Sequence, residues 1–280
     1  MAEPYFKNKT FGVIAPAGRV DNKKLVQAVE TWLSWHAGVK IMPHVSGFES
    51  DFFSAPATMR AADINMAFAD DEIDFVICAR GGYGCAELHD LIDWEMLAKK
   101  PKVLIGYSDI TALHQMMLKH GCGIPVSGAM FLRAGELFTE DADNYKSFLN
   151  ALTGEKQILK TDAEVPFCGK CVVANLAVLS SLCGTELLSD FSGKCLILED
   201  LNEPPYKIHR MLNQLAQAGI FDSIAAIASG EFMDCGERYE IEKIFRTFAD
   251  RYSLPYYSGL PIGHGNKIHA VNMLADIMLY

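Results

Sequence analysis

The sequence has no long hydrophobic run and no concentration of basic charge. Its longest uncharged stretches, 171–185 and 252–266, are 15 residues each, whereas a membrane-spanning helix needs about 20 predominantly apolar residues. The chain carries 25 Lys and Arg against 35 Asp and Glu, a formal net charge of −10. A protein that binds nucleic-acid phosphates needs a basic surface. We therefore expect neither a membrane protein nor a nucleic-acid-binding protein.

The eight cysteines are scattered and do not have the spacing of a metal site. Cys168 and Cys171 form the one CxxC motif, and no histidine lies within 30 residues on either side of it. A structural zinc site needs four ligands, so we expect no metal. Cysteines placed among apolar neighbours favour buried, reduced thiols. They predict a protein of a reducing compartment.

What the sequence does have is an alternation of apolar runs and amphipathic patterns. Half of its residues are hydrophobic and 21% are charged, as in soluble proteins with a packed core. Continuous apolar runs at 11–15, 74–79 and 102–105 predict buried strands, and helical spacing from 110 to 120 predicts a helix. Buried strands separated by helices are typical of a parallel sheet covered on both faces. The chain is therefore expected to have an α/β fold.

The second half shows the same alternation after a polar interval. Strands are expected at 195–198, 224–228 and 276–280, and amphipathic helices near 206–219 and 240–252. The pattern weakens between about 150 and 170. We predict an N-terminal α/β domain over 1–150, a linker over 151–170 and a smaller C-terminal α/β domain over 171–280.

A serine follows the third apolar run in the segment Gly106-Tyr107-Ser108-Asp109. Its place between a strand and a helix resembles a nucleophile elbow, although Ile110 stands where the G-x-S-x-G motif has its second glycine. Ser108 could instead cap the helix that follows, since Ser and Asp are both good N-caps. The local sequence taken alone favours the cap.

A glycine-rich turn, Arg80-Gly81-Gly82-Tyr83-Gly84, follows the second run. Such turns expose backbone N–H groups that can bind an anion or stabilise an oxyanion. The segment lacks the Lys-Ser/Thr of a P-loop and the spacing of a dinucleotide fingerprint, so we expect no nucleotide cofactor. A tight turn that needs positive φ explains the glycines equally well.

Two further residues complete a set of catalytic types. Glu199 ends an apolar run, and His264 lies between two glycines in a loop. A hydroxyl nucleophile needs a base, and the base needs a partner that fixes its tautomer. Ser108, Glu199 and His264 supply these roles, although Glu199 could also be a helix cap or a solvated charge. Spacing cannot show that they are close, so the residues alone indicate no more than a candidate serine hydrolase.

Six segments occur in an order that resembles the LD-carboxypeptidases, the family that includes the microcin C self-immunity proteins. They are VIAPAG, RGGYG, GYSD, ANLAVLSSLCGT, LILEDLNEPPYKIHRML and GLPIGH. The resemblance spans about residues 11–275. It implies a two-domain, cofactor-free serine peptidase that forms a homodimer. It also implies that the enzyme removes the terminal D-alanine from murein tetrapeptides in the cytoplasm, during peptidoglycan recycling.

The resemblance also implies roles for individual residues. The family's nucleophile lies in its G-x-S-D turn, which is Ser108 here, its acid in L-E-D, which is Glu199, and its histidine in G-H, which is His264. The oxyanion-hole amides correspond to Asp109 and Gly82.

Substrate contacts are expected from the glycine turn, namely from Arg80, Gly81 and Tyr83, and from Asn175. Arg80 could grip the substrate's terminal carboxylate in a bidentate fork or could bridge loops for stability. The segments 173–176 and 271–274 depart from the family pattern, the second in what is expected to be a loop near the histidine. Two other functions stay open: hydrolysis of a microcin-like peptidyl-adenylate, and binding of cell-wall peptides without catalysis.

Overall fold

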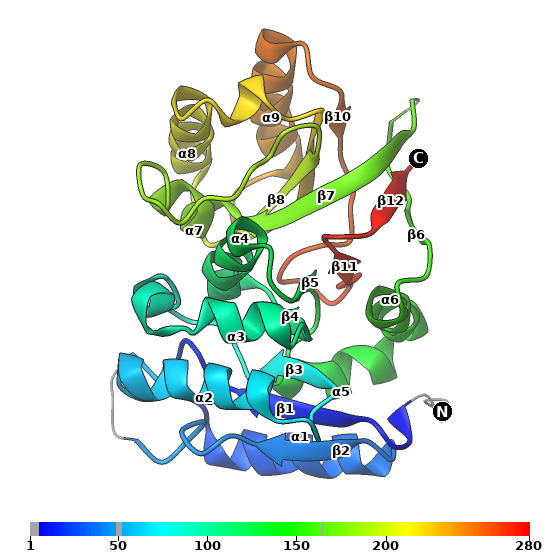
Figure 1. The fold of residues 1–280 in the computed structure, drawn as a ribbon. Coiled ribbons are helices and arrows are strands. Elements are labelled where there is room, and N and C mark those ends of the chain that lie inside the picture. Colours follow the sequence, from blue (N-terminus) through cyan, green and yellow to red (C-terminus); the bar gives the residue numbers. More distant parts are fainter. Residues whose placement is uncertain (1–5, 49–51, 164) are drawn as a thin grey trace.

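The computed structural model describes residues 6–48, 52–163 and 165–280. It has two lobes, each built on one sheet, and Figure 1 shows the N-terminal lobe below the C-terminal lobe. Each sheet has a hydrophobic core cluster of its own. The expected α/β class, with two parallel-rich sheets, is confirmed.

The first sheet is parallel except at one edge, where β11 runs antiparallel to β5. Its strand order is β11 (Val271–Asn272), β5 (Ile124–Ser127), β4 (Val103–Gly106), β3 (Phe75–Cys78), β1 (Thr10–Ile14) and β2 (Gly38–Ile41). The three apolar runs predicted as strands are β1, β3 and β4. In such open sheets the carboxyl ends of neighbouring strands form the binding crevice, and here the turns after β1, β3 and β4 meet.

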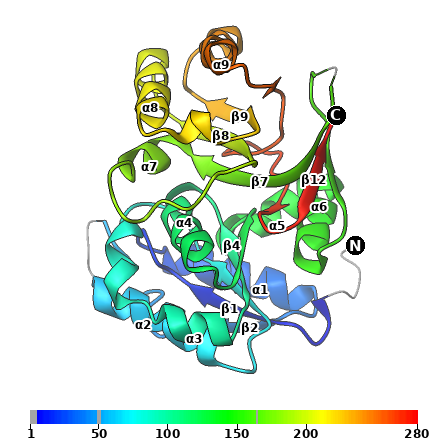
Figure 2. The same cartoon turned by 45° about the horizontal axis from the view of Figure 1, so that its top comes forward.

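Helices cover both faces of this sheet (Figure 2). They are α1 (Asn22–Ser34), α2 (Ala57–Ala69), α3 (Trp94–Lys99), α4 (Thr111–His120), α5 (Phe131–Glu140) and α6 (Ala142–Thr153), with the 3₁₀ turns η2 (Ala86–Leu91) and η3 (Ser108–Ile110). α1 packs against α5 on one face, and α2 packs against α3 on the other. Trp32 is fully buried in α1, where its ring stacks on Phe131.

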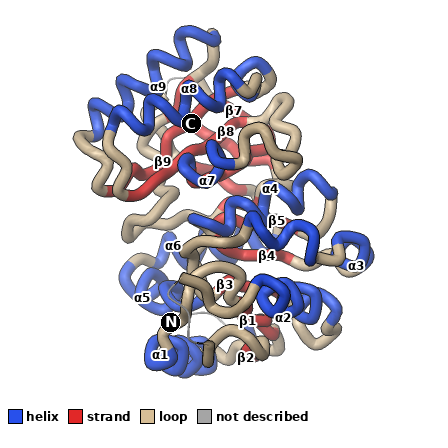
Figure 3. Tube along the Cα trace, turned by 90° about the vertical axis from the view of Figure 1, so that its left-hand side faces the viewer, coloured by secondary structure: helices blue, strands red, loops and turns tan. Residues whose placement is uncertain are grey.

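The second sheet is mixed. Its order is β10 (Tyr256–Tyr257), β9 (Ala226–Met233), β8 (Cys195–Leu201), β7 (Phe167–Asn175), β12 (Asp276–Leu279) and β6 (Gln157–Leu159). Its helical elements are α7 (Leu176–Ser181), α8 (Pro205–Gln217), η4 (Ile220–Asp222) and α9 (Arg238–Tyr252). β12 runs antiparallel to β7, and the remaining neighbours are parallel. Figure 3 shows α7, α8 and α9 with these strands at the upper end of the molecule.

The chain crosses between the lobes more than once. The interval 151–170 contains β6 and the first residues of β7, both in the second sheet. Near the C-terminus, β11 returns to the first sheet before β12 joins the second. The expectation that 271–274 forms a loop is therefore wrong for Val271 and Asn272, which pair with β5 and are buried, whereas residues 273–274 form a turn.

Candidate active site

Ser108 lies in a left-handed turn at the end of β4. Its φ is +64°, a conformation that is uncommon for a residue with a Cβ. In this described segment no side-chain hydrogen bond caps η3 or α4, so the structure does not support the helix-cap interpretation. A Cβ on Gly106 would lie 2.8 Å from Cγ1 of Ile110, which shows how closely the turn is wound. The geometry is that of a nucleophile elbow, where backbone strain lifts a hydroxyl above the strand end.

The glycine turn after β3 lies directly against Ser108. A Cβ on Gly81 would come within 2.9 Å of Ser108 Cβ and 3.1 Å of its Oγ. The Gly81 carbonyl accepts a hydrogen bond from Gly18 N–H at 3.1 Å. Because the carbonyl and the N–H of a trans peptide point in opposite directions, the N–H of Gly82 points away from Gly18. No acceptor for this N–H is found among the described residues, so it can donate to an external group.

Two buried side chains fix this glycine turn. Arg60 is 1% exposed and donates hydrogen bonds to the carbonyls of Pro16 and Gly84, which follow β1 and β3. The Asp109 carboxylate accepts a hydrogen bond from Cys85 N–H at 2.9 Å. Burial raises the pKa of Asp109, and the Cys85 N–H opposes that shift. The nucleophile turn and the glycine turn are therefore held together as one unit.

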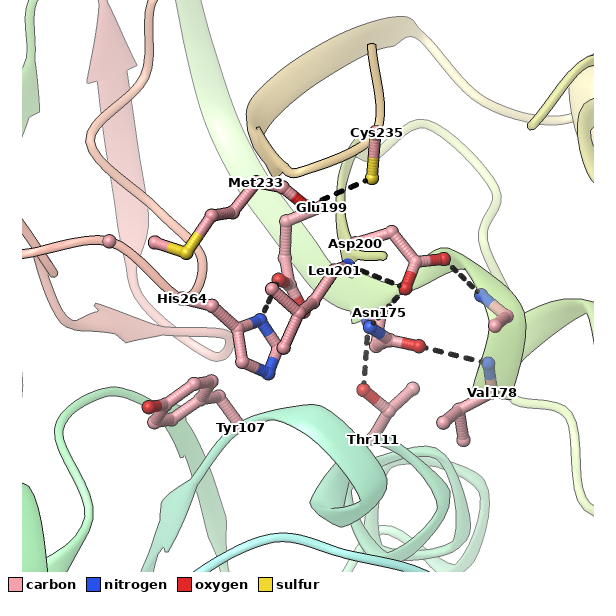
Figure 4. Close-up of polar contacts among 12 residues, drawn as sticks. Tyr107, Thr111, Asn175, Val178, Glu199, Asp200, Leu201, Met233, Cys235 and His264 are labelled. Carbon is pink, nitrogen blue, oxygen red and sulfur yellow. Dashed lines mark hydrogen bonds and ion pairs between the residues drawn. The ribbon is translucent and has the colours of Figure 1, made fainter. Parts of the chain in front are cut away.

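His264 and Glu199 form a hydrogen-bonded pair in the C-terminal lobe. His264 Nδ1 lies 2.7 Å from Glu199 Oε2, and in Figure 4 the other ring nitrogen faces the N-terminal lobe beside Tyr107. Glu199 is 2% exposed, and its second oxygen has no partner among the described residues. A carboxylate on Nδ1 fixes the tautomer that leaves Nε2 free to accept a proton.

The loop that carries His264 needs both of its glycines. Gly263 has φ +143°, and a Cβ there would lie 3.3 Å from Glu199 Oε2. A Cβ on Gly265 would overlap the carboxylate of Glu231, which accepts the N–H of Gly265. Burial raises the pKa of Glu231, and this N–H opposes the shift. The flanking glycines thus let two carboxylates approach the backbone of the loop.

Arg133, near the start of α5, holds the same loop from the other lobe. Its guanidinium donates to the carbonyls of His264 at 2.9 Å and Gly265 at 3.3 Å, and to Asn266 Oδ1 at 3.4 Å. It also lies 3.5 Å from the Tyr107 hydroxyl. The Tyr107 ring packs edge-on against the His264 ring, with centroids 4.9 Å apart. Arg133 therefore connects the nucleophile lobe to the backbone of the histidine.

Ser108 and His264 line one cavity of about 850 Å³ between the lobes. Arg80, Gly81, Gly82, Tyr107 and Arg133 also line it. In the part of the chain that the structure describes, Ser108 and His264 share a cavity without being hydrogen-bonded. Catalytic hydrogen bonds often shorten only when a substrate binds.

Residues 11–127 match the LD-carboxypeptidase N-terminal domain, and residues 168–279 match the LD-carboxypeptidase C-terminal domain. The chain belongs to the LD-carboxypeptidase family. It is 32% identical to a probable murein peptide carboxypeptidase of Bacillus subtilis, over 95% of this chain and 86% of that protein.

Solved structures show the same two-lobed fold. The muramoyltetrapeptide carboxypeptidase of Oxalobacter formigenes aligns with a TM-score of 0.85 at 28% identity, over 95% of this chain and 92% of that one. The microcin C7 self immunity protein MccF, in complex with aspartyl sulfamoyl adenosine, aligns with a TM-score of 0.82 at 20% identity, over 98% of this chain and 93% of that one. The second likeness concerns the fold alone.

Of the residues expected at the substrate in this LD-carboxypeptidase family member, Arg80 and Gly81 line the cavity, and Tyr83 and Asn175 do not. Arg80 is exposed at the cavity wall, where one guanidinium nitrogen donates to the Arg19 carbonyl at 2.9 Å. Tyr83 is 68% exposed and stacks on Phe53. Asn175 is buried, and neither it nor Tyr83 is among the described residues that line the cavity.

The polar groups of Asn175 are engaged within the protein. Its N–H donates to Thr111 Oγ1 at 2.9 Å, its side-chain amide donates to Asp200 at 3.0 Å, and its oxygen accepts Val178 N–H at 3.1 Å (Figure 4). Burial raises the pKa of Asp200 to about 6. Asn175 thus caps α7 and joins the two lobes behind the catalytic pair.

Sequence reasoning missed Arg60, Tyr107, Arg133 and Glu231. Nothing in the local sequence marks Arg133 or Glu231, because their contacts join segments far apart in the chain. The glycines on both sides of His264 were a usable signal for a crowded loop.

The described residues contain no group of three or more His, Cys, Asp or Glu that could hold a metal ion. None of their helices is long and apolar enough to cross a membrane. All eight cysteines are free thiols.

Proposed function

We propose that this protein is a serine carboxypeptidase that releases the terminal D-alanine from murein tetrapeptides. The observation that carries the proposal is the Glu199–His264 pair, which faces the same cavity as the strained Ser108. A serine in an elbow can act as a hydroxyl nucleophile, and an imidazole oriented by a carboxylate can act as its base. Both face one cavity here.

In the proposed first step, Ser108 Oγ attacks the carbonyl of the scissile L,D-peptide bond while its proton moves to His264 Nε2. Glu199 stabilises the imidazolium, which then gives that proton to the departing amine of D-alanine. The C–N bond breaks and an acyl-enzyme ester remains. Water attacks the ester through the same histidine, and Ser108 leaves with the proton returned to it.

The oxyanion is assigned to the N–H groups of Gly82 and Asp109. Gly82 N–H points away from Gly18, and Asp109 lies in a 3₁₀ turn whose first N–H groups have no partner within the turn. Removing one such donor typically lowers kcat by about 10²–10³-fold. Gly81 supports the hole by leaving space for Ser108.

Arg80 is the proposed contact for the substrate's free carboxylate. It lines the cavity with Ser108, and one of its terminal nitrogens already donates to Arg19 O. The other guanidinium N–H groups can reach a ligand. Tyr83 and Asn175 are assigned only supporting roles, the first at the rim of the turn and the second in joining the lobes.

The decisive experiment is mass spectrometry of a muropeptide tetrapeptide incubated with the protein. We expect the peptide to lose one alanine. Ser108→Ala should lower the rate of this reaction by many orders of magnitude and keep the wild-type melting temperature. A variant with a tenth of the wild-type rate would remove Ser108 from the mechanism. Absence of turnover by the wild type, with the peptide bound, would favour the non-catalytic alternative.

A peptidyl-adenylate is the second substrate to assay, because the fold is shared with MccF. Parallel turnover of a tetrapeptide and of an aminoacyl-adenylate analogue separates the two. A higher kcat/KM for the adenylate would replace the murein assignment and leave the triad intact.

The same proposal places the reaction in the cytoplasm and gives the protein a homodimeric state. The free thiols fit a reducing compartment, and the dimer rests on the family resemblance. Light scattering after size-exclusion chromatography tests the dimer, and a monomeric mass at the concentration of the assay would contradict it.

A further inference from the structure

Two histidines meet outside the active site, where η2 adjoins the end of α4. The Nε2 atoms of His89 and His120 are 3.3 Å apart. The side chain of His89 is 25% exposed, and His120 is exposed at the helix end. Both rings are therefore accessible from solvent, and the mechanism above uses neither of them.

The separation of the two nitrogens matches a pair of ligands on one tetrahedral ion. With Zn–N bonds of about 2.0–2.1 Å, two nitrogens at the tetrahedral angle lie about 3.3–3.4 Å apart. Two ligands at a right angle, as in square-planar or octahedral sites, would lie only about 2.9 Å apart. The observed distance of 3.3 Å, at which the two rings can also share an N–H···N hydrogen bond, fits the tetrahedral arrangement better than the right-angled one.

Neighbouring groups already orient both rings. Asp90 Oδ1 lies 3.0 Å from His89 Nδ1, and a carboxylate on the second ring nitrogen fixes the tautomer in which Nε2 can bind a metal. The His120 ring stacks on Trp94 with an interplanar angle of 5°. Trp94 Nε1 donates to the His89 carbonyl at 2.9 Å, so one indole holds both histidines.

The nearest cation in sequence is directed elsewhere. Lys119 precedes His120, and its amine donates to the carbonyl of Glu186. Asp90 adds a negative charge beside the pair, and the chain as a whole carries a net charge of −10. Lys119 still acts on His120 through its charge, and Asp90 and the net negative charge of the chain oppose that effect.

We propose that His89 and His120 bind one borderline divalent metal ion, with Zn²⁺ the best match, and that water or an external ligand completes the tetrahedron. The ion would link η2, which continues from the glycine turn, to the far end of α4, which begins at the nucleophile turn. Its effect is to stabilise the N-terminal lobe. Catalysis by Ser108 does not pass through it, so the site can be tested apart from the proposed function.

The test is calorimetric titration of the full chain with ZnCl₂, combined with thermal unfolding with and without zinc. We expect zinc to bind with a stoichiometry of one at this pair and to raise the melting temperature. His89→Gln and His120→Gln should each weaken binding at least about tenfold, and Asp90→Asn should weaken it less, as outer-shell partners do. Mg²⁺ should neither bind nor stabilise.

Two variants serve as matched controls. His36→Asn removes another exposed histidine at φ +60°, a conformation that Asn accepts. Cys168→Ser removes the exposed thiol. Neither should change zinc affinity. The melting temperature without zinc shows whether each variant is folded. Because the two histidines lie on separate elements, a single folded histidine variant is enough to test the site. Wild-type affinity in a folded His89→Gln or His120→Gln variant, or loss of binding in Cys168→Ser, would overturn the site.

Discussion

Arg133 should control kcat through the position of His264 without touching the reacting atoms. Its two terminal nitrogens reach the carbonyls of consecutive residues, His264 and Gly265, at 2.9 and 3.3 Å. A lysine can serve only one of these acceptors, because its ammonium is a point charge on a flexible stem. We therefore predict that Arg133→Met is strongly impaired and that Arg133→Lys recovers part of the loss.

The magnitude follows from two separate effects. A misplacement of about 1 Å in a catalytic group lowers the rate by about 10²-fold, so kcat of Arg133→Met should fall by about that factor. Hydrogen bonds from a charged donor contribute about 1.5–3 kcal/mol when buried. Arg133 is only half-buried, so the variant should lose about 1–2 kcal/mol of unfolding free energy in total.

The assay is steady-state kinetics on a murein tetrapeptide together with urea denaturation. Arg210→Met, an exposed arginine of α8 that packs over Tyr206, is the matched control and should leave kcat unchanged. An unchanged kcat in Arg133→Met would refute the positioning role. A raised KM with unchanged kcat would instead assign Arg133 to substrate binding.

The remaining predictions concern four other positions. Glu199→Gln should lower kcat by about 10⁴-fold with little loss of stability, and a tenfold effect or less would contradict its role on His264. Gly81→Ala should lower kcat at least tenfold, because the new Cβ would lie 2.9 Å from Ser108 Cβ. Wild-type kinetics in this variant would show that the backbone of the turn can move to accommodate the Cβ. Arg80→Lys should lower kcat/KM about tenfold on a free carboxyl terminus and little on an amidated one, and equal losses would make Arg80 structural. Burial lowers the pKa of His114 to about 4, so between pH 6.5 and 4 the unfolded chain takes up a proton that the folded protein does not. The free energy of unfolding should therefore decrease by about 3 kcal/mol as the pH is lowered through this range. Urea denaturation should show a smaller decrease in His114→Gln.

Much of the fold could be predicted from the sequence because its central strands are continuous apolar runs. β3 and β4 are buried throughout, β1 is buried after Thr10, and β8 is apolar up to Glu199 and Asp200 near its carboxyl end. β2 has the burial pattern of an edge strand, with three half-buried residues and one exposed, and its sequence carries no such signal. β11 is two residues long, too short for any periodicity.

The site was predictable in its residue types but not in its assembly. The order of the motifs singled out Ser108, Glu199 and His264 as candidates, and the glycines marked where backbone must approach closely. Ser108 itself was ambiguous, since a serine before a helix is usually a cap. Only the left-handed φ and the contact with Gly81 distinguish an elbow from a cap. Contacts such as Arg133 with His264 depend on how the lobes dock, which no local pattern encodes.

The docking of the lobes is itself part of the catalytic arrangement. The proposed nucleophile and the proposed oxyanion turn lie at the carboxyl ends of β4 and β3, whereas Glu199 and His264 belong to the C-terminal lobe. Asn175 N–H donates to Thr111 Oγ1 at the start of α4, β11 pairs with β5, and Arg133 binds the histidine loop. The first two connections lie away from His264, whereas the third holds the backbone carbonyl of His264 itself. A change at Thr111 should therefore disturb lobe docking and stability, whereas a change at Arg133 should also lower kcat by about 10²-fold, because Arg133 holds the backbone of His264.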